Sequence, residues 1–476
     1  MSNGKLPEAT LAHLKQQHPK PERFEQFVSA CLSEPRLALR VNTRKISLTE
    51  FQQRADQNHW QLSPIPWTRD GFWVDYDALH ALGNHIDHLT GLYYLQESTS
   101  MLPVEALFHH HSPKLILDMA AAPGSKTTQL NNHLNDGFIV ANDLSSSRVK
   151  MLNANLIRCG LADVALMHQD ARRLPEQLNA TFDGILLDAP CGGEGTIRKD
   201  PKAWSNWSPD SLQSLSDLQK QLIETAWQML APSGRLIYST CSLSREENQQ
   251  VVEHILQQVG DEARLVGLDS LFSGADEVSD GAMLNIWPEV FNTEGFFVAA
   301  IEKIATADSQ SHALEQHASG NRLSNKQYNL VQHYLSDRFG FNISDYKERL
   351  AIQDSNKHTT VWLKPKCPSK IQGLHTQRSG IKVCNLFQSR KGLGINLDHE
   401  FCRTYGNQCH HHVLPLSESD VVSYFKGMNI HPEHDLSEGE IILTHRSQPI
   451  GLGKVLKNGQ VKNQLPRPLV HDNAWA

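Results

Sequence analysis

The chain has 476 residues, 39% of them hydrophobic, with a formal net charge of −7 and a pI near 6.4. This length is sufficient for about two to four domains, and the acidic balance argues against a protein that coats nucleic acid nonspecifically, so any RNA contact must be local. No apolar run approaches the roughly 18 residues of a membrane span, and the N-terminal stretch lacks the features of a secretion signal, so we expect a cytosolic protein.

Residues 1–100 are expected to form a small α+β domain. A helical pattern from Leu6 to about Val28 is rich in Lys, Gln and Glu, and a mixed segment begins at Arg40. Nothing in the pattern places the aromatic side chains of this segment on one exposed face. We therefore assign its three tryptophans to the core: Trp60, Trp67 and Trp73.

Residues 101–304 alternate apolar strands with helices. The predicted strands are Leu115–Leu117, Phe138–Asn142, Val164–Met167, Gly184–Leu187 and Arg235–Tyr238, and 295–299 is expected to close the sheet. The predicted helices lie at 101–107, at 127–134, from Ser145 to just before Gly160, over 215–230 ahead of Pro232 and Gly234, and after a capping box formed by Ser244 and Glu247. This alternation predicts an α/β fold, a doubly wound parallel sheet that binds ligands at the carboxyl ends of its strands.

Chemically active side chains occur where these strands end. The first strand leads into the small residues of Ala120–Ser125, a loop that is neither G-x-G-x-x-G nor a Walker A loop, because Ser125 precedes Lys126 where the latter needs glycine. Asp143 follows about 20 residues later, where an open sheet places an acid for ribose hydroxyls. Later strands lead to Asp170, Asp188, Cys191 and Cys241.

A thiol and an acid at one site suit methylation of cytosine at C5. That carbon is a poor nucleophile until a thiolate adds to C6 and a proton is placed on N3. The fourth and fifth strands should be neighbours, so Asp188, Cys191 and Cys241 can converge on one base. A free cysteine has a pKa of about 8.5 and needs a helix N-terminus or a cation to ionise; Cys241 precedes the expected capped helix.

The remaining cysteines and the histidine clusters do not indicate a metal site. The eight cysteines show no paired C-x-x-C spacing, so a disulfide framework or zinc site is not expected. Four are assigned to the core: Cys31, Cys159, Cys367 and Cys384. His109–His111 are assigned to a turn. Cys402, Cys409 and His410–His412 are assigned to a surface loop.

The C-terminal third is expected to begin after a polar linker at 305–325. Residues 326–476 form a further region, whose end alternates short strands with glycine turns. Five basic residues lie in that end with no acidic residue among them: Arg446, Lys454, Lys457, Lys462 and Arg467. A solvated face and a nucleic-acid contact surface explain this cluster equally well.

Seven motifs together resemble the RNA cytosine-5 methyltransferases of the Nop/Sun type. They are R-V-N-T (40–43), L-Q-E-S-T-S-M-L-P (95–103), A-A-A-P-G-S-K-T (120–127), N-D (142–143), D-A-P-C-G-G-E-G-T (188–196), S-T-C-S-L (239–243) and G-F-F-V-A (295–299). Ala120 and Ser125 replace a cysteine and a glycine that are frequent in the family loop, and both are small. The P-I-G-L-G-K and N-Q-L-P-R segments resemble the end of a PUA-type RNA-binding module.

The resemblance implies a Rossmann-like class I methyltransferase domain at 101–304, between an N-terminal RNA-binding extension (1–100) and a mainly β, PUA-like C-terminal region. It implies S-adenosylmethionine as cofactor, with Asp143 on the ribose, Asp170 near the adenine and Asp188 beside the methyl group and the cytosine. Cys241 is implied as the nucleophile and Cys191 in release of the RNA. The implied cofactor loop consists of Ala120, Ala121, Ala122, Pro123, Gly124, Ser125 and Lys126.

The implied substrate is a cytosine in the decoding-region helix of 16S rRNA within the assembled 30S subunit, acted on by a monomer that needs no DNA, membrane or protein partner. A target base must leave its stack to reach strand ends, which is easier in loops or distorted helices. Two alternatives remain: a tRNA cytosine-5 methyltransferase, and a ribosome-assembly protein without catalysis. Methylation of an exocyclic amine is disfavoured because Cys191 follows Pro190.

Overall fold

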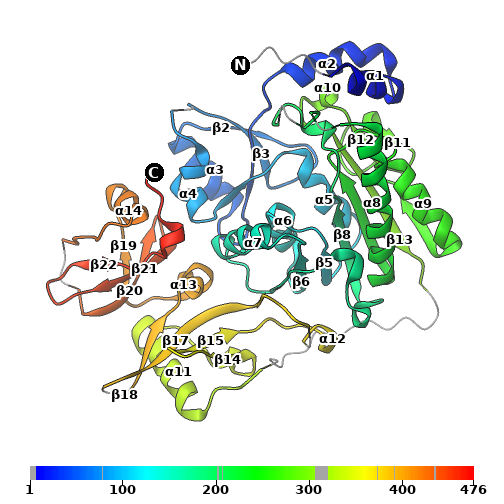
Figure 1. Ribbon diagram of the computed structural model, residues 1–476. Helices are drawn as coiled ribbons and strands as arrows, with labels where there is room; N and C mark the ends of the chain where they lie inside the picture. The colour runs from blue at the N-terminus through cyan, green and yellow to red at the C-terminus, as the bar shows by residue number, and fades with distance from the viewer. Residues whose placement is uncertain are drawn as a thin grey trace.

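The computed structural model describes residues 7–77, 79–200, 203–205, 207–305, 320–372, 374–390, 392–433 and 436–476. Four sheets organise these residues: a large central sheet, one N-terminal sheet and two C-terminal sheets. In Figure 1 the central sheet and its helices occupy one side of the molecule, and the two C-terminal sheets lie on the other side of α7. Most of the expected linker, residues 306–319, lies outside the described residues.

The N-terminal segment contributes to two places in the fold. Its antiparallel sheet has the order β2-β3-β1-β4 and packs with two helices; the elements are β1 (Ala38–Val41), β2 (Gln61–Pro64), β3 (Gly71–Asp75), β4 (Tyr93–Leu95), α3 (Leu48–Gln57) and α4 (Ile86–Leu89). Helices α1 (Glu8–Gln17) and α2 (Phe24–Leu32) instead lie beside α10 (Pro288–Phe291), as Figure 1 shows. Trp60 and Trp67 are buried and Trp73 is partly buried, which confirms the core assignment.

The central sheet has the expected parallel core. Its order β9-β8-β5-β6-β7 joins β5 (Leu115–Asp118), β6 (Phe138–Asn142), β7 (Val164–Met167), β8 (Phe182–Asp188) and β9 (Leu230–Thr240). The expectation that 295–299 closes the sheet is wrong. β13 (Phe296–Lys303) pairs antiparallel with β9 and carries further antiparallel strands: β10 (Ala263–Val266), β12 (Met283–Ile286) and, on β12, β11 (Ser279–Asp280).

The opposite edge of the central sheet is completed from the C-terminal region. The two-residue strand β16 (Arg378–Ser379) pairs antiparallel with β7. Backbone bonds from Gln377 N to Leu166 O (2.8 Å) and from Gly380 N to Val164 O (3.2 Å) extend this pairing. A segment about 200 positions away along the chain thus covers the β7 edge.

The helices between the strands differ from expectation at their ends. They are α5 (Leu102–Phe108), α6 (Ser125–His133), α7 (Ser146–Cys159), α8 (Pro209–Met229) and α9 (Gln249–Val259). α6 begins two residues before the expected Thr127, directly after Gly124, whose φ of +105° suits glycine. α8 begins at Pro209, six residues before the expected start, and ends at Met229, one residue before the expected end, because Leu230 already pairs with Phe182 of β8. α7 ends at Gly160 as expected.

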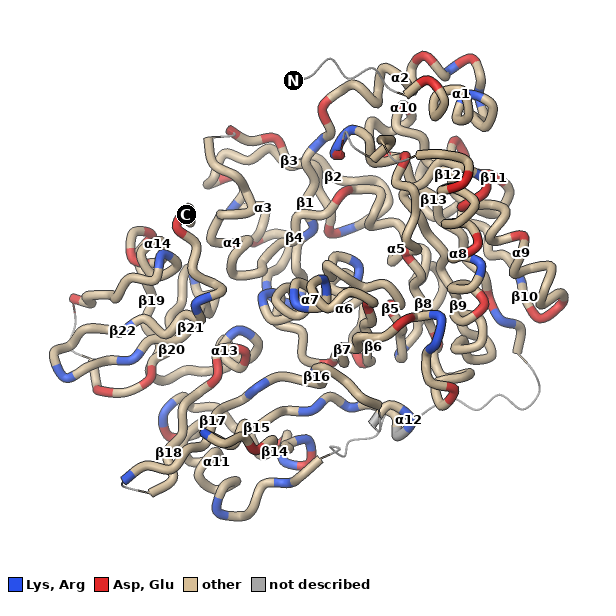
Figure 2. The backbone as a smooth tube through the Cα atoms, in the orientation of Figure 1, with Lys and Arg blue, Asp and Glu red and all other residues tan. Residues whose placement is uncertain are grey.

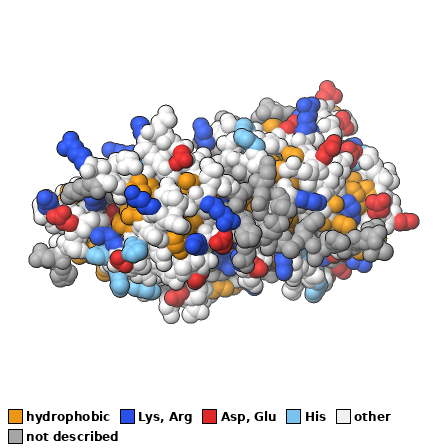
Figure 3. All heavy atoms as spheres, turned by 90° about the horizontal axis from the view of Figure 1, so that it is seen from below, with side chains coloured by type: hydrophobic (Ala, Val, Ile, Leu, Met, Phe, Trp, Pro, Cys, Tyr) orange, Lys and Arg blue, Asp and Glu red, His pale blue; other side chains and the backbone are white. Residues whose placement is uncertain are grey.

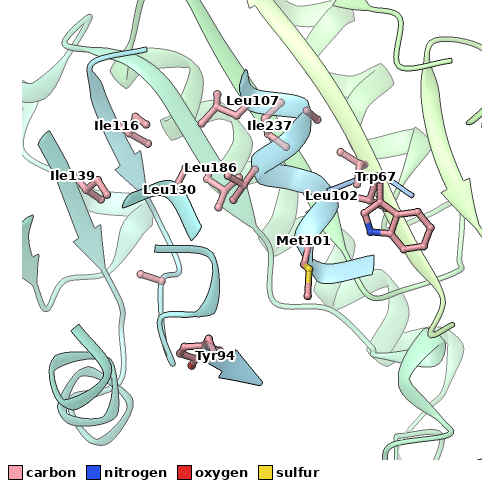
Figure 4. Close-up of a cluster of buried hydrophobic side chains, with 14 of the residues drawn as sticks. Trp67, Tyr94, Met101, Leu102, Leu107, Ile116, Leu130, Ile139, Leu186 and Ile237 are labelled. Atoms are coloured by element: carbon pink, nitrogen blue, oxygen red, sulfur yellow. The ribbon is translucent and has the colours of Figure 1, made fainter. Parts of the chain in front are cut away.

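The sheet is buried on both faces, which explains why its strands are almost wholly apolar. Alternate side chains of β5 enter opposite clusters: Ile116 packs with Leu186 and Ile237 on the face covered by α5 and α6 (Figure 4), whereas Leu115 and Leu117 pack on the face covered by α8 and α9. Because both faces are fixed by packing, the strand ends present their residues at a rigid edge.

The C-terminal region contains two units. The first combines the antiparallel sheet β14-β15-β17-β18 with helices; its elements are β14 (Leu350–Asp354), β15 (Thr359–Leu363), β17 (Ile381–Ser389), β18 (Gly392–Leu397), α11 (Asn325–Phe339), α12 (Ser369–Gln372) and α13 (His399–Tyr405). The second is the sheet β19-β20-β21-β22 with α14; its elements are β19 (Val413–Pro415), β20 (Gly439–His445), β21 (Gln448–Val455), β22 (Val461–Asn463) and α14 (Glu418–Phe425).

The surface-loop assignment of Cys402 and Cys409 is wrong. Cys402 lies in α13 with 0% of its surface exposed, and its thiol donates to Gly451 O; Cys409 is also buried. Both belong to the core of the first C-terminal unit, so they act as small apolar side chains. Cys31, Cys159, Cys367 and Cys384 are buried as expected.

Buried cations on backbone carbonyls join the N-terminal, central and C-terminal parts. Arg403 of α13 donates to Ile450 O (3.2 Å), Leu89 O (2.9 Å) and Arg158 O (3.1 Å). Lys45 donates to Thr90 O (3.0 Å) and Arg158 O (3.1 Å). Because Arg403 bonds to carbonyls of the N-terminal and central parts and Lys45 bonds to a carbonyl of the central part, the three parts form one frame.

Charge on the surface is mixed. Figure 2 shows Lys and Arg along α7 and acidic residues at the turn between α9 and β10, and the face in Figure 3 mixes both signs. Among the described residues, no helix combines the length and apolar character needed to cross a bilayer.

Candidate active site

Two cysteines meet above the ends of β8 and β9. Because these strands are parallel neighbours with Asp188 opposite Ser239, the loops that follow them emerge side by side. The Cys191 and Cys241 sulfur atoms are 3.1 Å apart, and both residues are partly exposed. The hydrogen bond with Cys241 and burial raise the pKa of Cys191. Cys191 therefore keeps its proton and can donate it toward the sulfur of Cys241.

Asp188 lies at the same strand ends in an ion pair. Lys126 Nζ is 2.6 Å from Asp188 Oδ2 and 3.0 Å from Ser100 Oγ, and Ser239 Oγ donates to Asp188 Oδ1 at 2.8 Å. The Asp188 side chain is 30% exposed and that of Lys126 is 8% exposed. Asp188 is thus held on one oxygen by Lys126 and on the other by Ser239.

The loop after β5 is tied to the end of β6. Ala121 N donates to Asn142 O (2.8 Å) and Ala122 N to Asp143 Oδ2 (3.2 Å). Asp143 Oδ1 accepts from Ser145 N at 2.9 Å. Each Asp143 oxygen thus accepts one backbone N–H and keeps a second lone pair, and the half-exposed Arg148 guanidinium lies 3.6 Å from Oδ2.

Asp170 follows β7 at the same edge but is already paired. Its carboxylate accepts two bonds from the Arg172 guanidinium, with Nη2 at 2.6 Å, and one from Arg172 N at 3.0 Å. These bonds with Arg172 lower the pKa of Asp170. Every strand-end residue named from the sequence therefore lies at the carboxyl edge of the sheet, with the two cysteines in contact.

Glu194 is a site residue that the sequence did not reveal. It lies three positions after Cys191, is 0% exposed, and accepts bonds from the segment after Cys241. Leu243 N (3.0 Å) and the Ser242 hydroxyl donate to Oε2, and Ser244 Oγ (2.7 Å) donates to Oε1. A fully buried carboxylate surrounded by donors must be fixed in position.

The expected capping box of Ser244 and Glu247 is wrong, because both side chains are used elsewhere. Ser244 donates to Glu194, and Glu247 accepts from Gly192 N at 3.0 Å and from Gln219 Nε2 at 2.7 Å. Helix α9 instead begins at Gln249 after Asn248, without a side-chain cap. Cys241 is therefore not at a helix N-terminus, and Lys126 brings a cation to these strand ends through its contact with Asp188.

A cleft adjoins Cys191 on the side of α8. It has a volume of about 380 Å³ and is lined by Cys191, Gly192, Trp207, Leu212, Leu215 and Glu247, among others. Trp207 is held there by its bond from Nε1 to Glu194 Oε1 (2.9 Å). The cleft could receive a planar group that approaches the cysteines.

The strand-end residues fit a nucleoside cofactor with a carboxylate. The free lone pairs of Asp143 can accept ribose hydroxyls, and α6 begins at Ser125 with no side chain capping its first N–H groups. Such a helix start attracts a carboxylate. The described residues contain no group of three or more His, Cys, Asp or Glu arranged to hold a metal ion.

Three family models match successive parts of the chain. The model "16S rRNA methyltransferase RsmB/F" matches residues 106–302, "N-terminal domain of 16S rRNA methyltransferase RsmF" matches 6–98, and "Methyltransferase RsmF PUA domain" matches 411–471. These matches confirm the fold class expected from the sequence, a Rossmann-like methyltransferase sheet between an N-terminal domain and a PUA module.

Relatives of known name match over nearly the whole chain. Ribosomal RNA small subunit methyltransferase F of Vibrio cholerae is 42% identical, with 99% of this chain and 98% of that protein covered. The protein of the same name from Psychromonas ingrahamii is 40% identical with the same coverage.

Among solved structures, a methyltransferase homologue from Pyrococcus horikoshii is 32% identical (TM-score 0.52, 63% of this chain and 100% of that chain). NSun6 from the same organism, solved with SFG, shares the fold at 23% identity (TM-score 0.54, 63% of this chain and 99% of that chain).

Proposed function

The chain belongs to the ribosomal RNA small subunit methyltransferase F family, and from this premise we propose that it methylates C5 of one cytosine in 16S rRNA through a covalent bond between Cys241 and C6. The carrying observation is the contact between two thiols, 3.1 Å apart, at the strand ends. Methylation of an amine or hydroxyl has no use for two thiols, whereas C5 chemistry needs one to form an adduct and benefits from another to release it.

The family uses S-adenosylmethionine, which supplies an electrophilic methyl group when bound. We assign its ribose to Asp143, its adenine end to the vicinity of Asp170 and its amino-acid carboxylate to the loop Ala120–Lys126 at the start of α6. The assignments of the ribose and of the carboxylate follow from the remaining lone pairs of Asp143 and the uncapped helix start, whereas the assignment of the adenine end to Asp170 rests on the family resemblance. Lys126 is assigned chiefly to Asp188, since its ammonium is 2.6 Å from that carboxylate.

In the proposed reaction the Cys241 thiolate adds to C6 and the electron pair of the 5,6 double bond moves toward N3. Asp188 relays to N3 a proton drawn from the Lys126 ammonium, so the adduct is a neutral enamine. Its C5 is then nucleophilic enough to accept the methyl group that the cofactor would supply when bound. Pre-organisation by Lys126 and Ser239, at 2.6 and 2.8 Å from Asp188, holds that relay at one edge of the base.

Release reverses the addition. C5 loses its proton to water, the 5,6 double bond reforms, N3 returns its proton through Asp188 to Lys126, and Cys241 departs as a thiolate. Cys191 keeps its proton and donates its S–H toward the departing sulfur, which lies 3.1 Å away. A hydrogen bond to the leaving thiolate stabilises its charge and speeds the elimination.

We assign RNA contacts to the flanking parts, with the assembled 30S subunit as substrate, a cytosine of the decoding-region helix as target and a cytoplasmic monomer as the active form. In the module matched at 411–471, Lys454 and Lys462 are exposed and directly opposite each other on β21 and β22. Like charges in such a pair destabilise a sheet unless an anion lies over them. A phosphate backbone would supply that anion.

The test is to incubate the protein with S-adenosylmethionine and separately with 30S subunits, naked 16S rRNA and tRNA, and to map 5-methylcytosine. Wild type should mark one cytosine in 30S subunits, Cys241→Ala should be inactive, and Cys191→Ala should accumulate a covalent RNA adduct. Methylation by Cys241→Ala would refute the nucleophile assignment. Marking of tRNA alone would favour the tRNA alternative.

A further inference from the structure

We propose that Glu194 and Glu247 form a reciprocal carboxylate clasp, in which each side chain extends from the loop of one active-site cysteine to hold the backbone beside the other. Neither carboxylate is assigned contact with the base, so both are positioning residues that fix the two thiols relative to each other. The inference rests on the proposed function for its catalytic consequence. Its geometric part stands on the contacts alone.

The first half of the clasp reaches from the Cys191 loop to the Cys241 loop. Glu194 accepts from Leu243 N and Ser244 N of the second loop, at 3.0 and 3.3 Å, and from the hydroxyls of Ser242 and Ser244. In parallel, Gly195 N donates to Cys241 O at 2.9 Å. Backbone N–H groups and hydroxyls of the segment directly after Cys241 are therefore both hydrogen-bonded to Glu194.

The second half reaches back from the Cys241 loop. Glu247 accepts from Gly192 N, with both carboxylate oxygens within 3.2 Å of it. Gln219 of α8 donates to Glu247 Oε2 (2.7 Å) and to Pro190 O (2.9 Å). The residues on either side of Cys191 are thus held by one connected set of bonds.

The donors around both side chains require acceptor oxygens at both positions. Glu194 accepts from N–H and O–H groups, Glu247 accepts from Gly192 N and Gln219 Nε2, and both side chains are 0% exposed. Replacement by glutamine would turn an NH₂ group toward some of these donors and leave buried N–H groups without an acceptor. The loops would then shift locally while the sheet below them, packed on both faces, stayed in place.

The side chains of Ser244 and Glu247 join the two loops instead of capping the helix that follows them. Ser244 and Glu247 have the spacing of a helix capping box, yet each bonds across to the other cysteine's loop and α9 begins later, uncapped. A purely local role would have kept both side chains at the helix start. Because both side chains instead join the two loops, we infer that they determine the spacing of Cys191 and Cys241.

The test measures the rate of disulfide formation, which reports how the two sulfur atoms are placed relative to each other and needs neither cofactor nor RNA. Diamide oxidises two adjacent thiols to a disulfide and is itself reduced to the hydrazine, so Cys191 and Cys241 together lose two hydrogens. The other six cysteines are buried, so peptide mapping of the full chain isolates this bond. Wild type and the control Glu224→Gln, which alters a pair with His254 outside the cysteine loops, should crosslink rapidly.

Glu194→Gln and Glu247→Gln should crosslink on the order of tenfold more slowly than wild type. Ser244→Ala and Gln219→Ala, which each remove one donor, are milder variants for use if a glutamine variant does not fold; each should slow the same reaction severalfold. With RNA, Glu194→Gln should slow adduct formation, whereas Glu247→Gln should accumulate the adduct as Cys191→Ala does.

Crosslinking at the wild-type rate in folded variants of both glutamates would overturn the clasp. Slow crosslinking in a protein whose wild type never forms 5-methylcytosine would instead refute the proposed function and leave the clasp standing. The two failures are therefore distinguishable.

Discussion

Lys126 provides the sharpest test of how the site works, because two roles for it predict different kinetics. The loop position alone indicates a cofactor ligand, so its loss should raise KM for S-adenosylmethionine. The ion pair with Asp188 indicates a charge partner of the reacting base, so its loss should lower kcat. Lys126→Met keeps the unbranched chain and removes the charge.

The magnitude follows from the geometry. Unit charges 2.6 Å apart attract by about 6 kcal/mol at an effective dielectric constant of about 20, before the cost of desolvation. Asp188 is 30% exposed, so water replaces part of this attraction in the variant. We expect a net loss on the order of 2–3 kcal/mol in the transition state, or about 100-fold in kcat.

The assay is single-turnover formation of 5-methylcytosine on 30S subunits over a range of S-adenosylmethionine concentrations. Lys150→Met, an exposed lysine on α7, is the matched control and should behave as wild type. Lys126→Arg keeps the charge, but a guanidinium does not release its proton, so this variant should be impaired as Lys126→Met is if the proton relay operates. A variant whose kcat is unchanged while KM rises would refute the charge-partner role.

Three further predictions follow from burial and charge. Arg403→Met should lower the free energy of unfolding by about 3–5 kcal/mol, because three carbonyls from separate parts lose a buried charged donor; the midpoint of thermal denaturation measures this, and an unchanged midpoint would contradict it. Asp118 should contribute stability that is lost as pH rises from about 4 to 7, because burial raises its pKa in the folded state to about 7 and the unfolded chain releases this proton at lower pH. Glu247 and Glu294, whose pKa burial also raises to about 7, act in the same direction, whereas burial lowers the pKa of His85 to about 4 and of His88 and His399 to about 3, which acts in the opposite direction. Denaturation midpoints at several pH values should therefore show the stability of wild type relative to Asp118→Asn falling as pH rises, and a difference that does not change with pH would contradict this. Lys454→Glu with Lys462→Glu should weaken 30S binding and reduce its salt dependence, with a slope change of about one per lost phosphate contact; filter binding at several salt concentrations would show no change if these residues face away from RNA.

The sequence was sufficient to predict the elements whose order is set by local apolar pattern. The strands Phe138–Asn142 and Val164–Met167 have the predicted bounds, since each is a buried run flanked by turn or polar residues. The convergence of Cys191 and Cys241 also followed from adjacency of two parallel strands. The sequence therefore predicted where the site residues lie along the carboxyl edge of the sheet.

The sequence did not reveal what depends on contacts between distant segments. Ser244 and Glu247 match a helix cap, and only the fold shows that Glu194 and Gly192 N are the stronger partners. The strand at Arg378–Ser379 is two residues long and has no pattern of its own. Cys402 and Cys409 lie among polar neighbours in sequence, yet Cys402 is buried because α13 packs against β17 and β21.

The strand contributed by Arg378 and Ser379 has a consequence for how this protein can be divided. A fragment that ended near residue 304 would contain every proposed catalytic residue but would leave the backbone of β7 open along its outer edge. Open strands recruit strands from other molecules, so such a fragment should aggregate instead of behaving as a minimal enzyme. The C-terminal third of this chain is therefore a separate module in sequence and an integral layer of the catalytic sheet in space.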